Sequence, residues 1–212
     1  MCGNGLRGLS AYLFEQNMIE KEIFDIETLA GIRRVKIFTE NNHNNEKKVK
    51  MVKISMGKAY WDKKSIGMIG DDNDNVLEKE FYVHNKYFKI NCLSMGNPHC
   101  VIFDENINEL DIKTYGQHIE NNPTFKNKIN VEFAEIINPE RVKMRVWERG
   151  SGETKACGTG AAAIAAVIHK LNKTKENIIV EMPGGEVFIE VIDGEYFLTG
   201  EVKQNCYGYF ID

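Results

Sequence analysis

Many short stretches of the chain have the hydrophobic content and, as at residues 49–56, the two-residue alternation that are typical of β-strands. These patterns predict strands at residues 23–28, 33–38, 49–56, 80–91 (a hairpin), 100–103, 130–137, 141–148, 177–182, 186–192, 196–201 and 206–211. The helical period of 3.6 residues fits residues 6–17 and, after a glycine-rich turn, residues 161–171. Asn108 is expected to cap a third helix that runs to Ile119, and Gly184-Gly185 to form a hairpin turn.

The order of these elements indicates an α+β fold, because many short strands surround two widely separated helices without strand–helix–strand alternation. A Cys-Gly-x-Gly turn opens each of the two helices. We therefore predict two pseudo-symmetric halves, each a curled and mostly antiparallel sheet around a central helix, with a site in the cleft between them. Residues 1–56 would form an incomplete first half-domain, completed by the last strand at 203–212, and residues 57–202 the second.

Composition and charge argue against several classes of function. Among 212 residues, 42% are hydrophobic and 27% charged, as in ordinary globular proteins. A net charge of −4 without a basic run argues against nucleic acid as a partner, and no apolar segment is long enough for a membrane span. Five cysteines, an odd number without Cys-x-x-Cys spacing, argue against a disulfide framework or a zinc site. Together with the lack of a signal peptide before Cys2, this predicts a protein of the reducing cytoplasm.

The candidate chemistry lies in the two turns, Cys2-Gly3-Asn4-Gly5 and Cys157-Gly158-Thr159-Gly160. A helix N-terminus carries unpaired N–H groups and a partial positive charge, so it attracts anions such as a substrate carboxylate. A cysteine at this point is expected to have a lowered pKa, because its thiolate is also an anion. Two such turns facing each other would place a base and an acid on opposite sides of one carbon. Such a pair of groups can racemise or epimerise an amino acid without a cofactor.

Two other interpretations of the turns are open. Gly3-x-Gly5-x-x-Gly8 and Gly158-x-Gly160-x-x-Ala163 match the dinucleotide-binding fingerprint as bare patterns. That fingerprint requires an apolar strand running into the first glycine, whereas residues 148–156 are charged and glycine-rich. A single cysteine before a helix is also more often a small buried residue than a catalyst. The repetition of the turn weakens this second interpretation.

The two turns belong to a wider set of motifs, at residues 1–7, 96–99 (Gly-Asn-Pro-His), 130–133 (Asn-Val-Glu-Phe), 148–150 (Glu-Arg-Gly), 152–160 and 198–200. This set closely resembles diaminopimelate epimerase from one end of the chain to the other. It implies a cofactor-independent, pyridoxal-phosphate-independent isomerase that converts LL-2,6-diaminopimelate to the meso form, for lysine and peptidoglycan precursor synthesis. The partner it implies is this small-molecule substrate, with no metal. Members are commonly dimers, so the resemblance makes a homodimer conceivable and leaves the oligomeric state open.

The resemblance also implies roles for individual residues. Cys2 and Cys157 would be the two acid–base residues, and His99 and Glu148 would tune them and hold the α-amino group. The residues that would contact the substrate are Gly3, Asn4, Gly158 and Thr159 at the reacting carboxylate, and Asn97, Asn130 and Arg149, beside Glu148, at the distal head. Simpler interpretations remain for some of them: His99 as a turn cap, Asn130 as a turn residue and Glu148–Arg149 as a surface pair.

This chain departs from the family pattern chiefly at its front. Family members carry a leading segment before the first Cys-Gly-Asn-Gly, whereas here the turn begins at Cys2. We therefore expect weakened activity, because substrate contacts are missing and the Cys2 turn is less firmly held. Two further hypotheses are a related two-cysteine racemase for another amino acid and a non-catalytic fragment that only binds.

Overall fold

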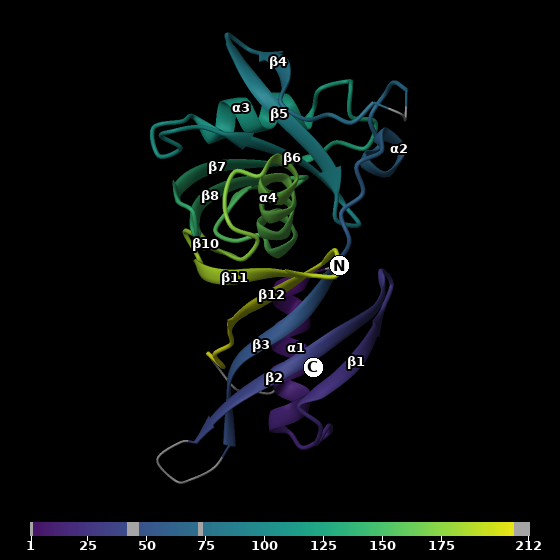
Figure 1. Ribbon diagram of the computed structural model, residues 1–212, viewed down its shortest axis with the longest axis vertical. Helices are drawn as coiled ribbons and strands as arrows, with labels where there is room; N and C mark the ends of the chain where they lie inside the picture. Colours follow the sequence, from purple (N-terminus) through teal and green to yellow (C-terminus); the bar gives the residue numbers. More distant parts are fainter. Residues whose placement is uncertain (1, 42–46, 72–73, 206–212) are drawn as a thin grey trace, which may run out of the picture.

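The structure is a computed structural model that describes residues 2–41, 47–71 and 74–205 (Figure 1). Its helices are α1 (Gly3–Glu15), α2 (Lys63–Ile66), α3 (Ile112–Glu120) and α4 (Gly158–Leu171). Its strands are β1 (Ile23–Thr28), β2 (Gly31–Asn41), β3 (Lys47–Gly57), β4 (Lys79–Val83), β5 (Lys86–Ser94), β6 (Pro98–Phe103), β7 (Asn130–Asn138), β8 (Arg141–Glu148), β9 (Gly152–Thr154), β10 (Ile178–Met182), β11 (Gly185–Ile192) and β12 (Glu195–Glu201).

The strands form one curled sheet that runs through the whole molecule. Its order is β1-β2-β3-β12-β11-β10-β8-β7-β6-β5-β4, and β9 pairs with β8 outside this path. Two pairs, β6–β7 and β8–β10, are parallel and the others antiparallel. In Figure 1, α1 lies with β1, β2 and β3 in the lower part, and α2, α3 and α4 lie in the upper part, with β11 and β12 between. The α+β class and the curled, mostly antiparallel arrangement are confirmed, although the strands of the two predicted halves form one continuous sheet, and the domain boundaries stay a prediction.

The strand predictions agree with the structure except at one place that cannot be compared. Each predicted strand overlaps an observed one, and the Gly184-Gly185 turn joins β10 to β11. The strand expected at 206–211 lies outside the described residues. This agreement has a simple cause, since alternation reports directly which side chains face the interior.

The helix boundaries needed correction. α1 begins at Gly3, three residues earlier than predicted, because Cys2 itself is the cap. α3 begins at Ile112 rather than after Asn108, because the Asp111 carboxylate accepts the N–H of Thr114 at 3.0 Å. The four-residue α2, capped in the same way by Asp62, was not predicted, because it is too short to show a helical period.

The two faces of β6 and β7 belong to different cores. Cys100, Val131 and Phe133 pack in a cluster with α2 and α3, whereas Val101 and Ala134 pack in a cluster with α4. Side chains alternate between the faces of a strand, so the residues two positions before each of the latter, His99 and Glu132, also face α4. Ala161 to Ile168 of α4 are all buried, which explains the almost uncharged sequence of this helix.

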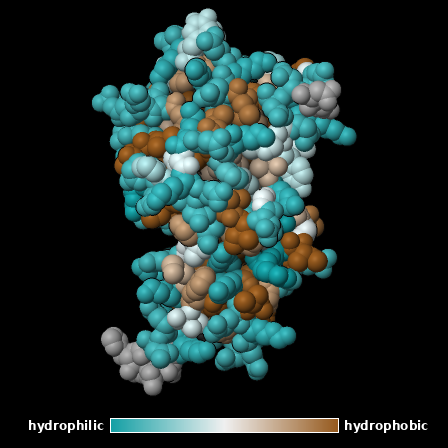
Figure 2. Space-filling view, in the orientation of Figure 1, coloured by the Kyte–Doolittle hydropathy of each residue, from teal (hydrophilic) through white to brown (hydrophobic). Residues whose placement is uncertain are grey.

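The surface is largely polar. Figure 2 shows mostly hydrophilic side chains on this face, with hydrophobic groups scattered along its middle and right-hand side. Several large hydrophobic side chains of α1, β2 and the β1–β2 turn are exposed, among them Tyr12 (54%), Leu29 (112%) and Ile32 (67%). None of the helices in the described residues is both long and apolar enough to cross a membrane.

The contact between α3 and β8 generates a stability prediction. A Cβ atom at Gly116 would lie 2.5 Å from Cβ of Trp147, whereas a Cβ at the helical Gly8 of α1 would meet nothing within 4 Å. We expect Gly116→Ala to lower the free energy of unfolding by about 1–3 kcal/mol through overpacking. Gly8→Ala should instead raise it by about 0.5–1 kcal/mol, because glycine is the poorer helix former. Urea denaturation of both variants measures this, and equal effects would contradict the packing argument.

Candidate active site

Both cysteine turns open helices, as predicted. Cys2 and Cys157 are the N-cap residues of α1 and α4, with extended backbones (φ −105° and −134°). In each turn the sulfur accepts a hydrogen bond at 3.4 Å from the N–H three residues later, Gly5 or Gly160. The two turns therefore share one local geometry, in which a sulfur atom occupies the position of a capping oxygen.

The fold brings the two turns together. A Cβ atom built on Gly158 would lie 3.8 Å from Cα of Gly3, 3.2 Å from Cδ1 of Leu198 and 3.9 Å from Cε of Met56. Gly3 and Gly158 are both buried. The N-termini of α1 and α4 thus lie against each other at Gly3 and Gly158, and the tightest contact that a Cβ at Gly158 would meet is the Leu198 side chain.

The surroundings of the two cysteines differ. Cys2 is exposed, whereas Cys157 is only 6% exposed. Burial, together with the carboxylates of Glu132 and Glu148, raises the pKa of the Cys157 thiol to about 12, against the lowering effect of the Thr159 hydroxyl and a backbone N–H. The predicted lowering of the pKa was therefore wrong for Cys157. The helix end does act in the predicted direction, but desolvation and nearby negative charge outweigh it.

His99 is completely buried, and its ring contacts other side chains instead of capping a turn. Its Nδ1 lies 2.7 Å from Oε1 of Glu132, and both side chains are completely buried. Its Nε2 lies 3.1 Å from Oδ1 of Asn97, whose Nδ2 donates to Oγ1 of Thr159 at 3.3 Å. Oγ1 of Thr159 is in turn 3.5 Å from the sulfur of Cys157. The structure thus joins four of the predicted residues in one hydrogen-bonded group.

The remaining predicted residues lie at the neighbouring strand ends. Asn130 pairs with His99 in the β6–β7 register, donates to the carbonyl of Pro98 at 2.8 Å and accepts the N–H of Arg149 at 3.0 Å. The carboxylate of Glu148 accepts a hydrogen bond from the hydroxyl of Thr154. The Arg149 side chain is exposed, and its Nη1 donates to the carbonyl of Asn127 at 3.2 Å. Asn130 thus fixes the start of the Glu-Arg-Gly turn.

Two buried carboxylates of this region were not predicted as site residues. Glu132 is the partner of His99, and Glu120 of α3 accepts hydrogen bonds from Nε1 of Trp147 (2.8 Å) and the N–H of Gly150 (2.9 Å). Burial acts to raise the pKa of Glu120, but these hydrogen bonds and Lys128 lower it overall. The available signal for Glu132 was a charged residue inside the apolar run from Val131 to Ala134.

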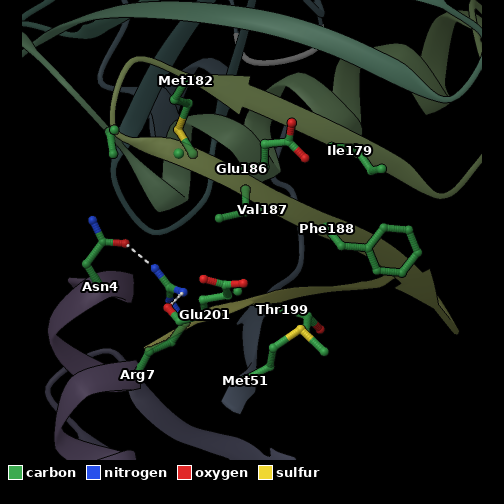
Figure 3. Close-up of a pocket in the computed structure, with 14 residues that line it drawn as sticks. Asn4, Arg7, Met51, Ile179, Met182, Glu186, Val187, Phe188, Thr199 and Glu201 are labelled. Atoms are coloured by element: carbon green, nitrogen blue, oxygen red, sulfur yellow. Dashed lines mark hydrogen bonds between the residues drawn. The ribbon is translucent and has the colours of Figure 1, made fainter. Parts of the chain in front are cut away.

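A cavity of about 710 Å³ lies beside the first turn (Figure 3). Asn4 is the only predicted site residue among those lining it, and its Oδ1 accepts a hydrogen bond at 3.0 Å from Arg7. Burial lowers the pKa of Arg7, which also donates to the carbonyl of Glu201 at 2.9 Å. Cys2 instead lines a separate, more apolar cavity of about 340 Å³. The candidate site therefore lies at the cysteine turns and their hydrogen bonds, outside this cavity.

Across residues 2–41, 47–71 and 74–205, no group of three or more His, Cys, Asp or Glu side chains is placed to hold a metal ion. The chemistry that this arrangement offers by itself is proton transfer between thiols beside two helix N-termini.

Solved structures share this fold. A crystal structure described as a probable proline racemase from Agrobacterium radiobacter K84 aligns with a TM-score of 0.69 at 13% identity, covering 95% of this chain and 65% of that one. A protein of the PhzF phenazine-biosynthesis family from Bacillus anthracis aligns with a TM-score of 0.58 at 18% identity, covering 96% and 74%. At these identities the likeness shows the fold alone.

Sequence comparison gives the family. The family model for diaminopimelate epimerase matches residues 91–204. The diaminopimelate epimerase of Halothermothrix orenii is 42% identical over 204 residues, covering 96% of this chain and 70% of the relative. That of Bacillus cytotoxicus is 38% identical over 213 residues, covering 99% and 72%. The chain therefore spans about 70% of these relatives' length and belongs to the diaminopimelate epimerase family.

Proposed function

We propose that the chain catalyses the cofactor-independent epimerisation of LL-2,6-diaminopimelate to meso-diaminopimelate, as an isomerase of lysine and peptidoglycan precursor synthesis in the reducing cytoplasm. The observation that carries the proposal is the meeting of two cysteine-capped helix N-termini at Gly3 and Gly158. A two-base epimerisation needs one base and one acid on opposite faces of a carbon, and each turn supplies a thiol. Family membership points to the substrate.

The proton transfers balance without a redox partner. One thiolate takes the α-proton, so the carbon–hydrogen bond breaks and its electron pair stays on the substrate. The other thiol then delivers its proton to the opposite face, a new carbon–hydrogen bond forms, and that sulfur becomes the thiolate. One thiol and one thiolate are present before and after, so the configuration at one carbon is all that changes.

The helix ends would stabilise the charge that develops during proton removal. The backbone N–H groups at Gly3-Asn4 and Gly158-Thr159 lie in the first turns of α1 and α4, where they have no partner within the helix. A carboxylate placed between the two turns would accept hydrogen bonds from both. Donors that are already oriented before the reaction stabilise a developing anion without reorganisation.

The distal head of the substrate would bind at the ends of β6, β7 and β8. We assign Arg149 to the distal carboxylate, because its guanidinium is exposed and its planar fork can pair with a carboxylate in bidentate fashion. Asn97 and Asn130 would line the same region, and the contact from Asn130 to the Arg149 N–H would aim that side chain. His99 and Glu148 would serve the reacting centre.

The first prediction concerns exchange at the α-carbon. Incubation of the reduced chain with LL-diaminopimelate in heavy water should introduce deuterium at one α-carbon and yield the meso form. Mass spectrometry measures the incorporated deuterium. Cys2→Ser and Cys157→Ser should each lower turnover by at least about 100-fold, because general acid–base residues contribute about 10²–10⁴-fold. Cys92→Ser, at a buried cysteine away from the turns, is the matched control. No exchange by the reduced wild-type chain would contradict the proposal.

The second prediction concerns the distal carboxylate. Arg149→Met should lower kcat/KM for diaminopimelate by about 10- to 100-fold, since charge-assisted hydrogen bonds are worth about 1.5–3 kcal/mol. The ratio of activity on diaminopimelate to activity on lysine, which lacks the distal carboxylate, should fall as well. Arg34→Met is the control, because Arg34 pairs with Asp25 on the exposed face of β2. An unchanged ratio in Arg149→Met would remove this role.

The third prediction follows from the raised pKa of Cys157. A folded-state value of about 12, against an ordinary value of 9.0, means that the unfolded chain ionises first as the pH rises. The stability from this group is therefore complete below pH 9 and is lost between pH 9 and 12. Above pH 9 the wild type should lose about 1.4 kcal/mol per pH unit relative to Cys157→Ser. Urea denaturation from pH 8 to 10.5 measures the two slopes, and parallel slopes would refute the buried thiol.

A further inference from the structure

Glu132 of β7 is a buried acid with an incomplete set of partners. Its side chain is completely buried, and Oε1 lies 2.7 Å from Nδ1 of His99. Its second oxygen, Oε2, is buried without a hydrogen-bond partner among the described residues. A buried carboxylate of this kind is costly to fold, so a stability role does not explain it.

The position of Glu132 links it to Cys157. A Cβ atom on Gly160 would lie only 2.7 Å from Oε1 of Glu132, so the carboxylate rests directly against the first turn of α4. The N–H of Gly160 donates to the sulfur of Cys157. Glycine at position 160 therefore leaves room for the acid beside the thiol.

A second route connects the same two residues. From Glu132, hydrogen-bond distances run through His99 (2.7 Å), Asn97 (3.1 Å) and Thr159 (3.3 Å) to the sulfur of Cys157 (3.5 Å). Together with the Gly160 contact, these hydrogen bonds form a closed ring that includes the Cys157 sulfur. Movement of any one of them would change what Cys157 faces.

The hydrogen bonds of this ring have defined donors and acceptors. Nε2 of His99 faces Oδ1 of Asn97, an oxygen that can only accept, so Nε2 is the donor in that contact, whereas Nδ1 faces Oε1 of Glu132. The amide nitrogen of Asn97 then points at Thr159 as a donor, which leaves the hydroxyl hydrogen of Thr159 free to point at the sulfur. A neutral residue at position 132 would remove the partner that fixes this order.

The charged side chains that act on Cys157 come from two strands. Glu132 of β7 and Glu148 of β8 both disfavour a thiolate, and His99 of β6 contacts the Glu132 carboxylate. From α1, the neighbouring group is the uncharged backbone at Gly3. Glu132 is the larger of the two electrostatic influences.

We propose that Glu132 is a positioning residue for the acid–base reaction, which acts through His99, Asn97 and Thr159 to fix the orientation and the protonation of the Cys157 thiol. Its role in catalysis rests on the proposed epimerisation, whereas its effect on the thiol does not. Glu132 itself touches neither cysteine sulfur through a hydrogen bond and is therefore not a catalytic residue.

The test follows Cys157 directly, by ¹³C NMR of the full chain labelled at cysteine Cβ, with Cys157→Ser to assign the signal. In Glu132→Gln the thiolate fraction at a given pH should rise about tenfold, since the loss of a neighbouring negative charge shifts such a group by about one pH unit. Glu132→Asp retains the charge and should stay within about threefold of the wild type. Glu135→Gln, a matched substitution on the opposite face of β7, should leave the titration unchanged.

A kinetic readout separates positioning from binding. In Glu132→Gln, kcat should fall about 10- to 100-fold with KM within about threefold, because misplaced acid–base groups slow the proton transfer more than they weaken binding. The wild type offers a check that needs no variant: the His99 Nδ1–H should give a slowly exchanging, downfield ¹H signal, as expected for a short hydrogen bond to a carboxylate.

The outcomes distinguish the two proposals. An unchanged Cys157 titration in Glu132→Gln would overturn the positioning role, whatever happens to activity. Absence of the His99 signal in the wild type would overturn it as well, even if the variant does not fold. A shifted titration in a chain that never exchanges the α-proton would support the link from Glu132 to Cys157 and reject the epimerisation.

Discussion

The close contact between the N-termini of α1 and α4 is the constraint on which the site depends. Each helix end carries a partial positive charge, so two of them placed face to face repel each other unless an anion lies near both. The backbones still approach so closely that a Cβ atom at Gly158 would touch Cα of Gly3 at 3.8 Å and crowd the Leu198 side chain at 3.2 Å. The sheet holds them there. Its strand β12 pairs with β3, which packs against α1, and with β11, which packs against α4. A site built in this way is prepared for an anion before one arrives.

How far the sequence predicts this arrangement depends on how local each signal is. The strands and both cysteine caps follow from neighbouring residues, through the two-residue alternation and the Cys-Gly-x-Gly spacing. The start of α3 could not be predicted from Asn108, because the carbonyls of Ile107, Asn108 and Leu110 are bound by Arg145, more than thirty residues further along the chain. That contact keeps this segment out of the helix and moves the cap to Asp111.

The same limit applies to the site. His99 and Glu132 are 33 residues apart and meet only because β6 and β7 are parallel neighbours in register. A histidine after Asn97-Pro98 is equally compatible with a turn cap, and nothing near it in sequence reveals the acid that it faces. Glu132 stands out in the sequence only as a charged residue between Val131 and Phe133, and neighbouring residues do not reveal that it is completely buried. Burial turns it into the main electrostatic influence on a thiol that lies in another element.

The two cysteines show most clearly why local sequence cannot fix chemistry. Their turns have the same sequence pattern, the same extended cap and the same 3.4 Å contact from an N–H to the sulfur. Burial and two carboxylates raise the pKa of Cys157 against the effect of its helix end, whereas Cys2 lies in the open. An epimerase that needs one acid and one base gains from such inequality. Two equivalent thiols have four ionisation states. In two of these states both groups are thiols or both are thiolates, and an enzyme in such a state cannot turn over.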